Sequence, residues 1–141
     1  MNSLMQEFDD RRVWALDGHE ITRLSLDYRF SIEIWWREEA THDNRVTVTI
    51  SNRFVLHRLG QQIEVNPEQP QTVGSALSVL YQPVDSLTVY RDGRLVLRML
   101  SGDEIVVEKD WNYESWEANG TGTLADIQMV CSPPERSPWG G

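Results

Sequence analysis

Apolar and polar residues alternate along much of the chain. In residues 24–36 the even positions are apolar and include Phe30, Ile32 and Ile34, whereas most of the odd positions are polar or charged. This period of two is typical of a strand in an antiparallel sheet with one buried face. Thirteen extended residues would span about 43 Å, too long for one strand in a small domain, so we expect a bend or tight turn near Asp27.

Short turn sequences divide the rest of the chain into similar runs. Asp-Gly pairs occur at 17–18 and 92–93, and further turn sequences occur at 42–44, 51–52 and 101–103. Asp-Gly between alternating apolar runs is a strong signal for a β-hairpin. We therefore predict a meander of roughly eight to ten strands.

One segment has a different period. Thr72 is a candidate N-cap for it, and Pro83 would end it. Its apolar residues follow the spacing of one face of an α-helix: Val73, Ala76, Leu77, Leu80 and Tyr81.

The predicted fold is of the α+β class and mostly β. It is a curved antiparallel meander sheet or partial barrel with one helix, at about 73–82, packed on it. We expect a single β-rich domain at 1–131 and a Pro- and Gly-containing tail at 132–141.

The formal net charge is −9, from 13 basic and 22 acidic residues. Such a balance repels nucleic acid and anionic membranes, and it attracts a basic protein. Much of the excess lies in residues 103–117, where alternation would place several carboxylates on one outward side. The candidate partner-binding residues there are Glu104, Glu108, Asp110, Glu114 and Trp116. The simpler interpretation is that the acidity serves solubility.

The stretch at 111–117, WNYESWE, is rich in aromatic residues. Glu114 and Glu117 would lie on opposite faces of a strand, which is poor geometry for a catalytic carboxylate pair. An exposed aromatic ring could instead bind a sugar or another small molecule, and the candidates are Trp35, Trp111 and Trp116. The remaining interpretation is a strand that packs aromatic side chains on both faces.

The chain offers little for catalysis or for cofactor binding. His19, His42 and His57 lack the spacing of metal ligands, so we expect no metal and no cofactor. Cys131 is the single cysteine, which excludes an intrachain disulfide, and its place after an apolar run favours packing over nucleophilic chemistry. There is no Gly-rich phosphate loop. We therefore expect a protein that is not an enzyme.

The expected location is the cytoplasm. The first residues lack the basic start and apolar core of a signal peptide, and no run approaches 18 apolar residues. A single cysteine also fits a reducing compartment.

Two short motifs near the ends of the chain resemble those of a family of small uncharacterised bacterial proteins. In that family a W-x-L-x-G element and a Y-E-x-W-E element bracket a β-rich domain. The matching residues here are Trp14, Leu16 and Gly18 for the first, and Tyr113, Glu114, Trp116 and Glu117 for the second. The C-terminal sequence SPPERSPWGG departs from the Pro-Gly-Gly turn and final strand with which the family usually closes.

The resemblance covers nearly the whole chain and implies a domain of unknown function with no enzymatic activity. Some similar small acidic bacterial proteins act as immunity proteins. We therefore expect a non-catalytic acidic binding protein, whose sharpest form is an immunity protein that neutralises a basic toxin. The alternative is a small-molecule or carbohydrate-binding β domain, and a homodimer is compatible with either.

Overall fold

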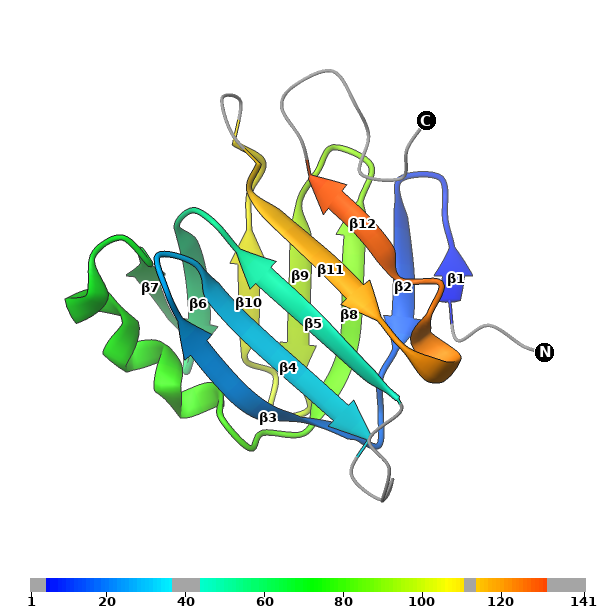
Figure 1. Ribbon diagram of the computed structural model, residues 1–141, viewed down its shortest axis with the longest axis horizontal. Helices are drawn as coiled ribbons and strands as arrows, with labels where there is room; N and C mark the ends of the chain where they lie inside the picture. The colour runs from blue at the N-terminus through cyan, green and yellow to red at the C-terminus, as the bar shows by residue number, and fades with distance from the viewer. Residues whose placement is uncertain (1–4, 37–43, 111–113, 132–141) are drawn as a thin grey trace.

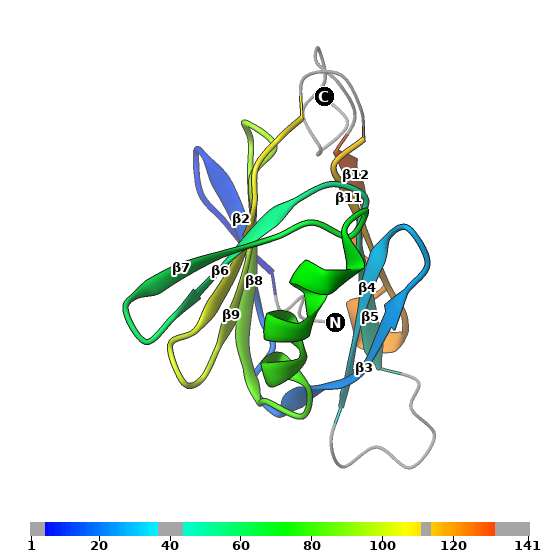
Figure 2. The ribbon, with the colours of Figure 1, turned by 90° about the vertical axis from the view of Figure 1, so that its left-hand side faces the viewer.

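Two antiparallel sheets make up the fold of the computed structural model, which describes residues 5–36, 44–110 and 114–131. The seven-stranded sheet has the order β1-β2-β8-β9-β10-β6-β7, and the five-stranded sheet has the order β12-β11-β5-β4-β3. Figure 1 shows the smaller sheet in front of the larger one, and Figure 2 shows both on edge. The mostly β antiparallel fold with one short helix, predicted from the sequence, is confirmed.

The strands take up most of the described chain. Those of the seven-stranded sheet are β1 (Met5–Glu7), β2 (Arg11–Ala15), β8 (Val84–Tyr90), β9 (Leu95–Met99), β10 (Glu104–Val107), β6 (Phe54–Arg58) and β7 (Gln61–Val65). Those of the five-stranded sheet are β12 (Gln128–Cys131), β11 (Trp116–Gly120), β5 (Arg45–Ile50), β4 (Phe30–Trp36) and β3 (His19–Leu26).

The inner faces of the two sheets form one hydrophobic core. Phe30, Ile32 and Ile34 of β4 are buried, and the polar residues between them are not, as the alternation predicts. The ring of Phe30 stacks on that of Phe54 in the opposite sheet, with 5.3 Å between their centroids. Burial of apolar side chains from both layers is therefore the main force that holds the sandwich together.

Two tryptophans connect the sheets in opposite directions. Trp14, on the seven-stranded sheet, donates its indole N–H to Asp126 in the segment before β12 at 3.2 Å. Trp116, on the five-stranded sheet, donates its indole N–H to the carbonyl of Gly93 in the β8–β9 turn at 2.8 Å. Each indole thus fills the core with its rings and satisfies its polar atom across the sandwich.

The turn sequences do not all form hairpins. The turns after Tyr90 and Met99 join paired strands, and a tight turn at residues 27–29 separates β3 from β4, as expected. The prediction of a single meander sheet, in contrast, needs correction. The Asp17-Gly18 turn and the Ser51–Asn52 segment each carry the chain from one sheet to the other. Asp-Gly favours a tight turn, but it does not decide which sheet the next strand joins.

The helix differs from the prediction in its type and its ends. It is the 3₁₀-helix η1 (Pro70–Val79), with Gln69 rather than Thr72 at the N-cap and Pro70 in the first turn. Its buried residues are Val73, Ala76 and Val79, which repeat every three positions, as a 3₁₀-helix requires. Leu77 and Tyr81, predicted on the buried stripe, are exposed.

The helix η1 lies at one end of the sandwich, between the two sheets (Figure 2). The second 3₁₀ segment, η2 (Gly122–Leu124), is a single turn before β12. No helix in the described part of the chain is both long enough and apolar enough to cross a membrane.

Candidate functional site

The four predicted partner-binding carboxylates lie in two different places. Glu104 and Glu108 line a hollow on the outer face of the seven-stranded sheet, whereas Asp110 and Glu114 line another hollow where the chain crosses between the sheets. The expected row on one side is therefore wrong. The reason is that β10 ends at Val107 and the chain leaves this sheet before β11 begins in the other one.

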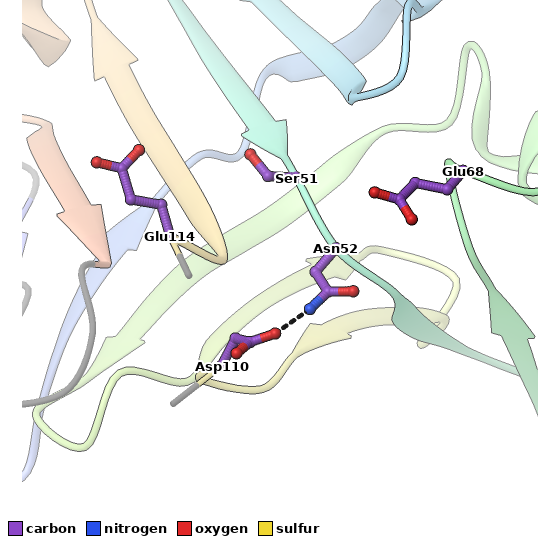
Figure 3. A pocket seen from close by; sticks show the side chains of 5 residues that line it. All are labelled: Ser51, Asn52, Glu68, Asp110 and Glu114. Atoms are coloured by element: carbon purple, nitrogen blue, oxygen red, sulfur yellow. Dashed lines mark hydrogen bonds between the residues drawn. The ribbon is translucent and has the colours of Figure 1, made fainter. Parts of the chain in front are cut away.

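Figure 3 shows the hollow at the crossing, called here the acidic hollow. Its volume is about 330 Å³, and it is lined by Ser51, Asn52, Glu68, Asp110 and Glu114. Ser51 and Asn52 lie in the crossing from β5 to β6, and Asp110 and Glu114 lie in the crossing from β10 to β11. Glu68 comes from the loop before η1. The acidic hollow is thus lined by three carboxylates from two segments that are distant in sequence, the loop before η1 and the crossing from β10 to β11.

Asp110 is fixed by its neighbours. The side-chain amide of Asn52 donates a hydrogen bond to the carboxylate of Asp110, as Figure 3 shows. The backbone N–H of Asp110 donates to the hydroxyl of Ser115 at 2.6 Å, and the N–H of Arg53 donates to the side-chain carbonyl of Asn52 at 2.8 Å. These bonds tie the two crossings together. Asp110 thus has a structural role in addition to its charge.

Glu68 and Glu114 are different. Both are exposed, and within the described ranges neither makes an ion pair or a side-chain hydrogen bond. Among the described residues that line the acidic hollow there is no Lys or Arg. Two carboxylates that are not neutralised therefore flank a third one that is held in place, which makes the hollow suitable for a cationic group.

A metal ion is a less suitable occupant. Among the residues that the structure describes, no group of three or more His, Cys, Asp or Glu side chains is arranged to hold one. The acidic hollow can therefore attract a cation as a diffuse negative region, without the close set of oxygens that Ca²⁺ or Mg²⁺ needs.

The tryptophans offer less than the sequence predicts. Trp116 is only 1% exposed, because its indole fills the core and bonds to Gly93, so it belongs in neither the partner-binding set nor the ligand-binding set. Trp35 is half-buried on the outer face of the five-stranded sheet and donates its indole N–H to Glu33 at 3.3 Å. Trp111 lies outside the described residues. Among the described residues, the carbohydrate alternative therefore rests on Trp35.

Two of the described candidates for acid–base chemistry, His19 and Cys131, are buried, whereas His57 is half-buried on β6. His19 is 2% exposed, its Nδ1 lies 3.2 Å from the carbonyl oxygen of Leu16, and its ring meets Trp36 edge-on. Burial lowers the pKa of His19 and raises the pKa of the Cys131 thiol. Each shift favours the neutral form, so both side chains act as parts of the core. His42 lies outside the described residues.

Sequence reasoning missed Ser51, Asn52 and Glu68, because only the two crossings and the loop before η1 bring them to Asp110. It also missed the partners of Glu104 and Glu108 on the outer face. That hollow has a volume of about 450 Å³ and is lined by Val55, His57, Gln62, Tyr90, Arg94, Val96, Glu104, Val106 and Glu108. Strand pairing, which the local sequence does not reveal, places these residues together.

Comparison with known proteins identifies a family but no activity. The model of a family of unknown function (DUF6188) matches residues 13–136, which include both tryptophan motifs. A segment of 84 residues is 30% identical to part of a phosphoenolpyruvate carboxylase from Prochlorococcus marinus. This segment is 59% of the chain but only 8% of that enzyme. No solved structure matches the chain significantly.

Proposed function

We propose that this chain, which belongs to the DUF6188 family of unknown function, is a non-catalytic protein that binds a basic partner through its acidic hollow. A Lys or Arg side chain of the partner enters the hollow and lies beside Glu68 and Glu114. The observation that carries the proposal is that Glu68, Asp110 and Glu114 line one hollow, with no basic side chain among its described lining residues.

The geometry of the hollow favours a side chain over a free ion. A volume of about 330 Å³ accommodates the end of an Arg or Lys side chain. Guanidinium N–H groups can bond to carboxylates and also to the oxygens of Ser51 and Asn52. The hydrogen bonds around Asp110 hold one wall in place before binding, which lowers the entropic cost of association.

The net charge of the chain supports the same interpretation at longer range. A charge of −9 accelerates encounters with a basic protein and repels polyanions. The sharpest form of the proposal is an immunity protein that covers the basic active site of a toxin. In that role the acidic hollow would bind a basic side chain of the toxin, and the overall negative charge would raise the rate of association.

The double variant Glu68→Gln/Glu114→Gln tests the hollow. These carboxylates are exposed and have no partner among the described residues, so their loss should leave the fold intact. The probe is a tetra-arginine peptide, with its affinity measured by calorimetry at low and at moderate salt. We expect the variant to bind it roughly 5- to 30-fold more weakly, with a smaller salt dependence.

A matched control separates the hollow from the net charge. The variant Asp9→Asn/Glu117→Gln removes the same two charges at positions outside the lining of the hollow. It should bind the peptide within about twofold of the wild-type protein. Equal losses in the two double variants would mean that only the total charge matters, and the proposal would be wrong.

A further inference from the structure

The outer faces of the two sheets have different chemistry. On the five-stranded sheet the central row across the strands is mostly polar: Ser25, Ser31, Thr49, Glu117 and Val130. On the seven-stranded sheet the corresponding row is β-branched through five consecutive strands: Val13, Thr88, Val96, Val106 and Val55. Each member of this second row, the valine row, is only half-buried.

The valine row has no cover within the described part of the chain. Figure 2 shows no labelled helix or strand over the outer face of the seven-stranded sheet. At a strand spacing of about 4.8 Å the row is roughly 19 Å long, and it crosses the hollow of about 450 Å³. A row of half-buried β-branched side chains without cover is a candidate interface.

Charged residues flank the valine row in an ordered way. Arg98 on β9 and Arg94 just before this strand lie on either side of Val96 in the sequence. Glu104 on the adjacent strand β10 and Glu108 just after it lie on either side of Val106. Arg98 is directly opposite Glu104, and Val96 is directly opposite Val106. The centre of this face therefore presents one strand with positive charges beside one strand with negative charges.

We propose that this face binds a second copy of the chain, related to the first by a two-fold axis that runs parallel to the strands between β9 and β10. This axis places β9 of one copy over β10 of the other. Arg98 then faces Glu104 of the second copy, Arg94 faces Glu108, and Val96 packs on Val106. Each contact occurs twice, as an isologous interface requires.

The charge pattern selects this axis. The alternative is a two-fold axis that also lies between the two facing sheets but runs perpendicular to the strands. It would place Arg94 of one copy over Arg98 of the other, and Glu104 over Glu108, so that every charged contact would be repulsive. Packed sheets rotate by about 30° relative to each other, and this rotation displaces residues least at the centre. Arg and Glu side chains are long enough to meet across two layers separated by about 10 Å.

One of the charged side chains is already oriented. The guanidinium of Arg94 lies over the ring of Tyr90, 4.0 Å from its centroid. This contact already restricts the Arg94 side chain, so Arg94 loses less conformational entropy on binding. A contact centred on a row of five residues is small for a stable dimer, so the association should be weak. It should be visible at protein concentrations of about 100 μM and above.

Charge reversal at the centre tests the proposal. Sedimentation equilibrium from about 5 to about 500 μM should show the average mass rise from 16.3 kDa toward twice that value. The single variants Arg98→Glu and Glu104→Arg should each dimerise at least about tenfold more weakly, since each turns both attractive contacts into repulsive ones. An equimolar mixture of the two should associate again, because Glu at 98 then faces Arg at 104.

The other sheet provides the control. Arg23 and Glu33 form a cross-strand pair on its outer face, with 3.6 Å between Nε and Oε2. The variants Arg23→Glu and Glu33→Arg should leave the association unchanged. If a single variant at 98 or 104 is unfolded by circular dichroism, Arg98→Glu/Glu104→Arg restores the pair within the chain and should dimerise like the wild-type protein.

Three outcomes would overturn the proposal. The first is a wild-type protein that stays monomeric up to about 500 μM. The second is equal weakening by the control variants, and the third is folded single variants whose mixture does not associate.

Discussion

The two tryptophans that connect the sheets should contribute unequally to stability. Trp116→Phe removes the indole N–H that bonds to the Gly93 carbonyl, and both residues are buried. A buried carbonyl left without a donor costs about 1–3 kcal/mol, and the smaller ring leaves a cavity that costs about 1 kcal/mol more. We therefore expect Trp116→Phe to lower the free energy of unfolding by about 2–4 kcal/mol, a large part of the stability of a domain this size.

Trp14→Phe is the matched comparison. Trp14 is equally buried, but its acceptor, the carboxylate of Asp126, belongs to an exposed residue, so water can replace the lost donor. The expected loss is about 1–2 kcal/mol, mostly from the smaller ring. Urea unfolding followed by far-ultraviolet circular dichroism measures both variants without relying on tryptophan fluorescence. A loss for Trp14→Phe that equals or exceeds that for Trp116→Phe would refute the reasoning.

Two further predictions concern Gly18 and His19. Gly18 has φ +88° and lies against the ring of Trp36, whereas Gly60 has φ +77° and open space around it, so Gly18→Ala should lower the melting temperature clearly more than Gly60→Ala. Burial lowers the pKa of His19 from 6.5, so the unfolded chain binds more protons, and stability should fall as the pH decreases below about 6.5. Chemical unfolding at pH 7.5 and 5.5 should show a smaller pH dependence for His19→Phe, and an unchanged dependence would contradict the assignment.

Residue alternation in the sequence is sufficient to predict the strands but not their assignment to sheets. The period of two at 24–36 predicts which side of β4 is buried, because the side chains of any strand alternate between two faces. Whether the next strand pairs in the same sheet depends on the packing of distant segments. Asp17-Gly18 and Asp92-Gly93 are similar in sequence, yet only the second closes a hairpin.

The helix shows a similar limit. A window of apolar residues at 73–81 fits a period of 3.6 through Leu77 and Tyr81, and it fits a period of three through Val73, Ala76 and Val79. The structure has the second pattern, which turns Leu77 and Tyr81 to solvent. The sequence alone does not distinguish the two periods over so few turns.

The candidate site was predictable only in its charge. The excess of acidic residues at 103–117 identifies Asp110 and Glu114, but Glu68 lies more than 40 residues away and joins them through the fold. Trp116 lies in an aromatic-rich stretch, which suggests a ligand-binding site, but its side chain is part of the core. Its burial could not be deduced, because β11 begins just after a crossing, and there Ser115 and Trp116 are both buried in succession.

The distribution of charge differs between the two hollows, as the two proposed roles require. On the outer face Glu104 and Glu108 lie beside Arg94 and Arg98, so the face is close to neutral and suited to a surface of the same kind. The described lining of the acidic hollow has no such compensation, which favours the proposed basic partner. The two hollows share no lining residue within the described ranges, although the chain leads from one to the other after β10. Arg98→Glu should therefore leave peptide affinity unchanged, and Glu68→Gln/Glu114→Gln should leave dimerisation unchanged; a change in both properties from either variant would mean that the two surfaces act as one.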